Sequence, residues 1–215
     1  MSFVRFVQAI FGSPNVNIYI RRALLGAPEM LLYENLAYGQ ATPYLKIDGN
    51  TQYEIIVRPN LLGANPLATL SFFPSRHRDY TLIIEGTLEL PGGTAPMITA
   101  FTDSNGCHRK GCRASLRFIH AAALTASTAI NLLADGYVIY QNVLYPDAGV
   151  PAYIPAKATE FNFSVTATAT GAVLVPSFPL HLRKDHVYTL IVIGDPNSGL
   201  TVLPLVNRCH NEGCR

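Results

Sequence analysis

The sequence predicts an all-β protein that consists of two similar domains in tandem, and three observations support this prediction. Short runs of apolar or alternating residues recur along the chain, and no stretch of helical length shows a 3.6-residue period. Turn signals separate these runs at intervals of about 8–12 residues, as in sandwiches and barrels. Similar segments recur in the same order in the two halves. Each half, at about 100 residues, is large enough to bury its own core.

The duplication shows in pairs of segments that keep their order, while the spacing between them drifts as loops change length. The opening strands match, with VRFVQA in the first half and LRFIHA in the second. The pairs are residues 4–9 and 116–121, 16–18 and 128–130, 32–38 and 139–145, and 80–86 and 188–194. A cysteine motif near the end of each half makes a further pair. A period of this length indicates tandem domains rather than a short-repeat solenoid.

In the first half, the pattern predicts a series of short strands separated by turns. Residues 16–20 (VNIYI) alternate apolar and polar side chains, as a half-buried strand does. Turns rich in Gly, Pro, Asn and Ser fall at residues 12–15, 48–50, 58–60, 74–75 and 91–93. The expected strands cover residues 4–7, 16–20, 30–33, 43–47, 53–57, 68–72, 80–84 and 95–101.

The second half repeats this pattern. Residues 161–166 (FNFSVT) alternate most clearly, so one face of that strand is expected in the core. Pro176 and Pro179 predict an edge strand, because proline cannot donate a hydrogen bond to a neighbouring strand. The expected strands cover residues 116–120, 129–133, 137–140, 152–155, 160–167, 173–180, 188–193 and 200–206.

Composition narrows the choice of partners. The net charge is +2, and no basic run with interleaved aromatic residues occurs, so no nucleic-acid partner is expected. No window reaches the roughly 18 apolar residues of a membrane span. Charged residues make up 14% of the chain, against about 25% in an average protein. A sheet surface with few charges has weak protection against edge-to-edge association, so we expect the partners to be copies of the chain itself. The alternative is a soluble monomer with a Thr- and Asn-rich surface.

The apolar start of the chain is interpreted as a strand. Residues 3–11 contain Arg5 and Gln8, lack a preceding basic region and align with a strand of the second half, unlike a secretory signal. We expect an extracellular or cell- or spore-surface location without a recognisable signal peptide. That location then requires another export route, release by lysis of the producing cell, or a signal that was removed.

The four cysteines lie in two copies of one motif, Cys-His-x-x-Gly-Cys-Arg, and are predicted to form disulfides or cross-links. Cys107 and Cys112 lie between the halves, and Cys209 and Cys214 lie at the C-terminus. In one interpretation the cysteines of each motif bridge each other, and the glycine supplies the backbone freedom that a tight loop needs. In another, the motifs bridge one another or a neighbouring chain, because they lie outside the folded cores.

Two other interpretations of the cysteine motifs stay open. Thiolate ligands with His108 or His210 beside them suit zinc or copper, but Arg109 and Lys110 would repel a cation. The cysteine spacing also differs from that of common zinc folds, so no metal or other cofactor is expected. Alternatively, the cysteines are free thiols that the neighbouring histidine polarises.

No catalytic constellation stands out elsewhere, and we expect no enzymatic activity. Ser75, His77 and Asp79 lie too close in sequence to converge as a serine triad. His120 lies in an opening strand, where a hydrogen-bonded structural histidine is expected. Some tyrosines recur in both halves, which favours a packing or tyrosine-corner role over ligand stacking. These are Tyr33, Tyr38, Tyr140 and Tyr145.

The ordered set of segments resembles a known family. VRFVQA and LRFIHA are similar to the "VRFVHASP" opening of the domain-of-unknown-function family 4397, and residues 53–59 (YEIIVRP) resemble its "Y-x-V-x-V-R-P" strand. Its "N-V-x-Y" and "YT-h-h-h-x-G" blocks have counterparts in both halves. The resemblance implies tandem immunoglobulin-like β-sandwiches on the surface or in the extracellular material of bacteria, with no established enzymatic activity. The chain departs from the family pattern at Gln8, where His is common, after Ala121, where Ser-Pro is missing, and in its cysteine motifs.

These observations predict antiparallel β-sandwich domains at residues 1–106 and 115–207, a cysteine junction at 107–114 and a cysteine tail at 208–215. Our leading hypothesis is a structural subunit of an extracellular or spore-surface assembly, such as a filament, joined by sheet-edge contacts and cysteine-mediated links. One alternative is a surface module that binds a glycan or peptide through loops at one end of a sandwich. Another is a metal-binding protein that uses the Cys-His-x-x-Gly-Cys motifs.

Overall fold

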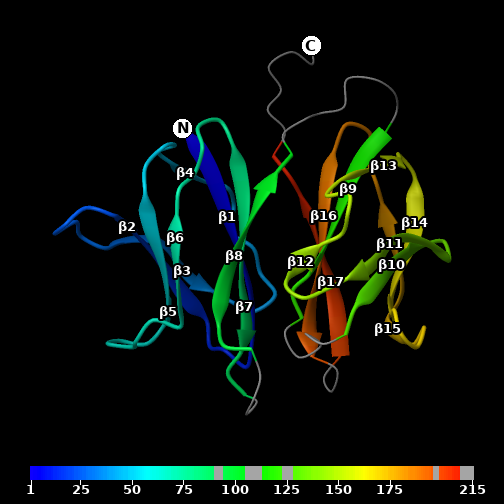
Figure 1. The fold of residues 1–215 in the computed structure, drawn as a ribbon, viewed down its shortest axis with the longest axis horizontal. Coiled ribbons are helices and arrows are strands. Elements are labelled where there is room, and N and C mark those ends of the chain that lie inside the picture. The colour runs from blue at the N-terminus through cyan, green and yellow to red at the C-terminus, as the bar shows by residue number, and fades with distance from the viewer. Residues whose placement is uncertain (90–93, 105–112, 123–127, 196–198, 209–215) are drawn as a thin grey trace. The chain divides into compact units, whose positions relative to one another are not determined.

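The computed structural model describes residues 1–89, 94–104, 113–122, 128–195 and 199–208 (Figure 1). The chain divides into two compact units, unit 1 at Met1–Asp103 and unit 2 at Ser104–Arg215. Both units consist of β-strands, and no helix occurs in the described residues. A helix with the length and apolar character of a membrane span is accordingly not found in this part of the chain.

Unit 1 contains two four-stranded sheets. One sheet has the strand order β4-β1-β7-β8, and the other has the order β3-β2-β5-β6. β1 and β7 run parallel, and the other pairs are antiparallel. The strands are β1 (Ser2–Phe11), β2 (Val16–Arg22), β3 (Met30–Leu36), β4 (Leu45–Ile47), β5 (Tyr53–Pro59), β6 (Ala68–Phe72), β7 (Asp79–Thr87) and β8 (Met97–Asp103).

Unit 2 repeats this topology. Its sheets have the orders β12-β9-β16-β17, with β13 also paired to β9, and β11-β10-β14-β15. β9 and β16 are parallel, as β1 and β7 are in unit 1. The strands are β9 (Arg113–His120), β10 (Ile130–Ala134), β11 (Tyr137–Val143), β12 (Asp147–Ala148), β13 (Ile154–Lys157), β14 (Glu160–Ala167), β15 (Val173–His181), β16 (Val187–Asp195) and β17 (Gly199–Val206). The prediction of two tandem all-β, sandwich-like domains is confirmed.

Each unit buries one apolar core between its two sheets. Phe6 and Ile18 lie in the core of unit 1, and Phe118 and Leu132 lie in that of unit 2, all without exposed surface. They come from alternate positions of strands, which point to one face of a sheet. Pro176 and Pro179 lie in β15, which is the outer strand of its sheet, so the predicted edge strand is confirmed.

The structure corrects one part of the sequence alignment. Val16 pairs with Leu36 across a bulged strand pair, and Ile130 pairs with Val143 in the same way. At the first bulge the Asn17 carboxamide accepts a hydrogen bond from the Asn35 N–H, and at the second the Asn131 carboxamide accepts one from the Asn142 N–H. Each bond is 2.9 Å long. Asn17 and Asn131, which accept these bonds, are therefore equivalent. Asn35 and Asn142, which donate them and have positive φ values, are equivalent as well. The match of residues 16–18 to 128–130 was wrong by two positions, because an ungapped alignment could not follow the longer connection before β10.

The tyrosine-corner geometry also falls on other residues than those expected. The hydroxyl of Tyr80 accepts a hydrogen bond from the Ser75 N–H, and the hydroxyl of Tyr188 accepts one from the Arg183 N–H, each at 2.9 Å. Both tyrosines stand near the start of a strand and bind backbone five residues upstream, as a tyrosine corner does. Tyr140 instead has the expected packing role, since its side chain is buried and its hydroxyl donates to the Leu116 carbonyl at 2.6 Å.

Candidate functional site

The predicted cysteine sites lie outside the described residues. This applies to Cys107, Cys112, Cys209 and Cys214 and to the two neighbouring histidines, His108 and His210. Disulfide, metal and free-thiol interpretations of the motifs therefore all stay predictions. Within the described part of the chain, no group of three or more His, Cys, Asp or Glu side chains is arranged to hold a metal ion.

His120 has the arrangement of a structural histidine. Its Nδ1 accepts a hydrogen bond from the Ala122 N–H at 3.3 Å, and its Nε2 lies 3.3 Å from the Thr128 carbonyl oxygen. At the corresponding place in unit 1, the Gln8 Oε1 accepts from the Ile10 N–H at 2.9 Å. Both side chains thus bind backbone two residues farther along, which explains why Gln and His occupy equivalent positions.

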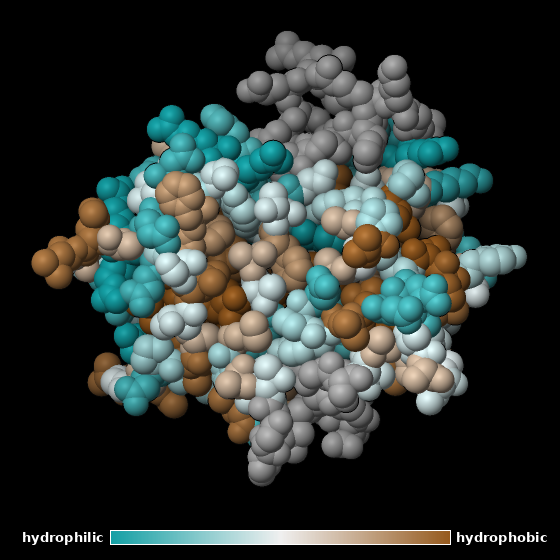
Figure 2. All heavy atoms as spheres, in the orientation of Figure 1, coloured by the Kyte–Doolittle hydropathy of each residue, from teal (hydrophilic) through white to brown (hydrophobic). Residues whose placement is uncertain are grey.

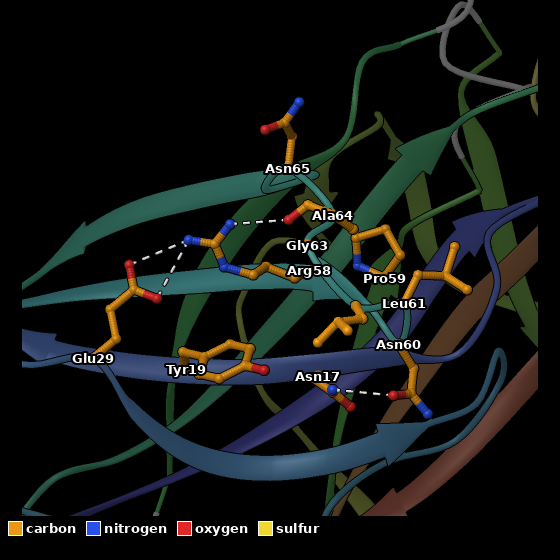
Figure 3. Close-up of a pocket in the computed structure, with 11 residues that line it drawn as sticks. Asn17, Tyr19, Glu29, Arg58, Pro59, Asn60, Leu61, Gly63, Ala64 and Asn65 are labelled. Atoms are coloured by element: carbon orange, nitrogen blue, oxygen red, sulfur yellow. Dashed lines mark hydrogen bonds and ion pairs between the residues drawn. The ribbon is translucent and has the colours of Figure 1, made fainter.

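The candidate site is a pocket of about 480 Å³ on unit 1, the Arg58 pocket (Figure 3). It lies over the outer face of the β3-β2-β5-β6 sheet. In β2, Val16, Ile18 and Ile20 are buried, so the alternating residues Asn17 and Tyr19 project to the other face. The connections at residues 23–29 and 60–67 supply the remaining walls.

Arg58 joins the two connections that border the pocket. Its Nη2 donates to both carboxylate oxygens of Glu29, at 3.2 and 3.3 Å, and its Nη1 donates to the Ala64 carbonyl at 3.1 Å. The centre of its guanidinium lies 6.0 Å from the Tyr19 ring centroid, within cation–π range. Figure 3 shows Arg58 between Glu29 and Ala64, with the Tyr19 ring beside it. A single side chain on β5 therefore holds both loops against the sheet.

A second ion pair balances the charge beside the pocket. Glu54 accepts from Arg21 directly across the β2–β5 pair, and Arg21 Nη1 lies 3.9 Å from Glu29 Oε1. The hydrogen bond and the charge of Glu54 raise the pKa of Arg21 above its ordinary value. Together with Arg58, these groups place two positive and two negative charges around the site, so the wall is polar but nearly neutral.

Asparagine side chains form a hydrogen-bonded cluster at one end of the pocket. The Asn17 amide donates to Asn60 Oδ1 at 3.2 Å, and the Asn60 amide donates to Asn35 Oδ1 at 3.0 Å. Asn15 also donates to Asn35 Oδ1, at 2.9 Å. The cluster fixes the orientation of carboxamides, which can both donate and accept hydrogen bonds.

The two loops share the sequence Leu-Leu-Gly-Ala, at residues 24–27 and 61–64. Their backbones make the same bonds, from the first leucine N–H to a carbonyl two residues earlier and from the alanine N–H back to the first leucine carbonyl. Gly26 and Gly63 have φ values of 76° and 74°, a region that favours glycine. Figure 2 shows apolar residues at the tip of the loop between β2 and β3, at the left of the view. Sequence reasoning missed this pair of loops, although the repeated tetrapeptide was its signal.

Unit 2 has different residues and shorter connections at the corresponding positions. Asn17 pairs with Arg58 across β2 and β5, whereas its counterpart Asn131 pairs with Thr166 across β10 and β14. The connection between β10 and β11 consists of residues 135–136. The Arg58 pocket is therefore a feature of unit 1 that the shared topology does not require.

Comparison with known families identifies the chain. The family model described as "Domain of unknown function (DUF4397)" matches residues 2–127, more than half of the sequence. The chain belongs to the DUF4397 family. This confirms the resemblance seen in the opening, "N-V-x-Y" and "YT" segments. No curated protein matches the chain.

Among solved structures, the chain is similar to one described as "Alpha-glucan binding by a streptococcal virulence factor". The match covers 93% of this chain and 96% of that chain, with 12% sequence identity and a TM-score of 0.29. Neither the identity nor the TM-score indicates a shared binding activity.

Proposed function

We propose that this DUF4397 protein is a surface binding module whose unit 1 binds a neutral, hydroxyl-rich ligand, a glycan, in the Arg58 pocket. The observation that carries this proposal is a pocket whose charged side chains are already paired around an aromatic ring. Its volume of about 480 Å³ lies in the usual range of ligand pockets, about 300–1,000 Å³.

The chemistry of the walls supports a glycan over an anionic ligand. The Arg58 guanidinium already binds the Glu29 carboxylate, so an incoming phosphate or carboxylate would have to displace that pair. Sugar hydroxyls both donate and accept hydrogen bonds, which matches the carboxamides of Asn17 and Asn60. The Tyr19 ring supplies an apolar surface for the C–H groups of a sugar ring.

A glycan array followed by calorimetric titration of the full chain tests the proposal. Replacing Arg58 by Ala, or Tyr19 by Ala, is expected to weaken binding of the best glycan about tenfold or more, because each removes a part of the wall. Thr166→Ala at the corresponding place in unit 2 is the matched control and is expected to change nothing. An array without hits, or binding that survives both substitutions, contradicts the proposal, and peptide binding at the same residues would assign the pocket to a peptide.

A second candidate function is the structural subunit of an extracellular or spore-surface assembly, such as a filament. The specific observation in its favour is the outer strand β3, where the edge of the sheet meets the half-exposed side chains of Met30 and Leu31. The cysteine motifs would add covalent links. Electron microscopy and non-reducing gels test this candidate: uniform monomers that migrate identically with and without reductant would eliminate it.

The proposal also includes a location outside the cell or on a cell or spore surface, and the absence of catalytic activity. Immunolabelling of intact cells and spores checks the location. Metal binding by the two cysteine motifs is the remaining alternative, and elemental analysis of protein purified without oxygen tests it: one bound zinc or copper ion per chain would support it.

A further inference from the structure

The two Leu-Leu-Gly-Ala loops of unit 1 carry adjacent, strongly exposed leucines, which we call the leucine tips. Leu24 and Leu25 are 67% and 108% exposed, and Leu61 and Leu62 are 65% and 109% exposed. Single exposed apolar residues are common on protein surfaces, but adjacent pairs on two loops indicate an interaction site. In each loop the alanine N–H binds the first leucine carbonyl, at 3.1 and 3.2 Å. Because these turns are hydrogen-bonded, little ordering is needed before the leucines meet a partner.

Both leucine tips stand on the outer face of the β3-β2-β5-β6 sheet, one near each end of β2. The loop at residues 23–29 follows Arg22, the last residue of β2, and the Asn60 N–H of the other loop binds the Asn15 carbonyl at 2.7 Å, next to the first residue of β2. The strand has 7 residues, so at about 3.3 Å per residue the bases of the loops are about 20 Å apart. Figure 1 shows both loops extending from the same side of this sheet.

The Arg58 pocket is lined by residues of both loops and has an apolar rim. Glu29 comes from the first loop, and residues 60–65 come from the second. Leu61 and Leu62 are among the lining residues, although most of their surface is exposed. A sugar held by Tyr19 and the asparagine carboxamides therefore lies beside apolar side chains. A free sugar has no large apolar part to cover them, whereas the lipid part of a glycolipid does.

The charges near the leucine tips favour a neutral lipid surface. Arg21 and Arg58 both contact Glu29, and Arg22 Nη2 lies 2.8 Å from Asp48 Oδ2. Every arginine of β2 and β5 is thus paired with a carboxylate. An anionic headgroup would have to displace these pairs, so the attraction to a lipid surface is expected to come from the leucines and the sugar rather than from charge.

The separation of the leucine tips favours a lipid layer over a protein partner. Two convex tips about 20 Å apart would need two apolar cavities at a matching distance on one protein. A lipid layer has an apolar interior beneath every point of its surface, so both tips can enter it without matched cavities. Proteins that lie on membranes bury apolar side chains about 5–10 Å into the boundary of headgroups and acyl chains.

We propose that the ligand of the Arg58 pocket is the sugar headgroup of a neutral glycolipid, and that the two leucine tips insert into the lipid layer around it. The inference rests on the proposed glycan binding and adds the surface on which the glycan is presented. The pocket supplies selectivity for the sugar, and the tips hold unit 1 on the lipid. Each contact raises the local concentration of the other, so the two strengthen one another.

Flotation of the full chain with vesicles tests the inference, and calorimetry with the soluble glycan tests the underlying function separately. One set of vesicles contains phosphatidylcholine alone. The other also contains the best glycan of the array joined to a diacylglycerol. The wild-type chain is expected to bind the glycan-bearing vesicles about tenfold or more tightly than the soluble glycan, and to bind plain vesicles weakly.

Leu24→Ser with Leu25→Ser is the decisive variant, because neither leucine lines the pocket. It is expected to keep the affinity for the soluble glycan and to lose the tenfold gain on vesicles. Tyr19→Ala is expected to show the opposite pattern, with weak binding to plain vesicles kept and binding of the soluble glycan lost. Val173→Ser in β15 of unit 2 removes an apolar side chain that is 64% exposed, and this control is expected to change neither measurement.

The two measurements separate failure of this inference from failure of the proposed function. Binding of the soluble glycan without a gain on vesicles, or a gain that survives Leu24→Ser with Leu25→Ser, would overturn the inference alone. A chain that binds no soluble glycan would overturn both. Association of the chain in reducing buffer without lipid, measured by sedimentation velocity and lost in the same variant, would assign the leucine tips to a second copy of the chain and overturn the inference.

Discussion

Units 1 and 2 share a topology but differ in the connections of the β3-β2-β5-β6 sheet and of its counterpart, the β11-β10-β14-β15 sheet. In unit 1, residues 23–29 and 60–67 form loops with exposed leucines, and Arg58 holds both. In unit 2, the corresponding connections span residues 135–136 and 168–172, and Thr166 replaces Arg58. The strands repeat because their inward residues must fill the same kind of core, whereas loops are free to diverge. The Arg58 pocket therefore depends on the connections of unit 1, which rest on a framework of strands that both units share.

The largest expected effect tests whether the two cores are equivalent. Phe6 and Phe118 occupy matching positions in β1 and β9, and neither has exposed surface. Phe6→Ala and Phe118→Ala are each expected to lower the free energy of unfolding of their unit by about 3–5 kcal/mol, from lost burial and the cavity left behind. Denaturant unfolding followed by circular dichroism measures both. A loss of unfolding free energy in only one of the two variants would show that the two cores are not equivalent.

A smaller effect concerns Glu85, a buried carboxyl in β7 whose counterpart in β16 is Ile193. Burial raises the pKa of Glu85 to about 8, and a hydrogen bond from Thr99 opposes the shift only in part. The folded state therefore keeps the proton between about pH 4.5 and 8 while the unfolded state releases it, so this group makes the protein less stable as pH rises through that window.

From pH 5 to pH 7, the contribution of Glu85 to the free energy of unfolding is expected to fall by about 2–3 kcal/mol, at about 1.4 kcal/mol per pH unit. Glu85→Gln, measured beside the wild type by urea unfolding at each pH, is expected to remove this part of the slope. Histidine titration is common to both proteins and cancels in the difference. Equal slopes in the two proteins would show that Glu85 does not hold a proton in the folded state.

The smallest expected effect tests the repeated tyrosine corners. Tyr80→Phe and Tyr188→Phe each remove one hydrogen bond from a hydroxyl to a backbone N–H. Each is expected to cost about 1 kcal/mol of unfolding free energy, with little change in packing. Thermal unfolding monitored by circular dichroism checks this, and a much larger loss for one of the pair would indicate that the two corners are not equivalent.

Much of the fold could be predicted from local patterns. Alternation in segments such as residues 16–20 and 161–166 marks half-buried strands, and Pro179 marks an edge, because both signals depend on near neighbours in the chain. The family resemblance was readable for the same reason. The correspondence of Asn17 with Asn131 could not be recognised from the sequence, because it depends on a bulge whose partner strand lies elsewhere in the chain.

The candidate site was harder to predict than the fold. Sequence reasoning placed the chemistry in the cysteine motifs, which lie outside the described residues, and overlooked Arg58. Nothing local marks that arginine, since its partners Glu29 and Tyr19 are far from it along the chain. A stricter search for short repeats would have found the two Leu-Leu-Gly-Ala loops, but not that one side chain joins them.

By itself, the sequence determined that the chain is all-β, duplicated and a member of the DUF4397 family, because strand periodicity and ordered motifs are properties of neighbouring residues. Only the tertiary structure decided that Glu29, Arg58 and Ala64 meet and that the Arg58 pocket belongs to unit 1. Those arrangements depend on strand pairing and loop closure between distant segments, which a pattern of neighbouring residues does not encode.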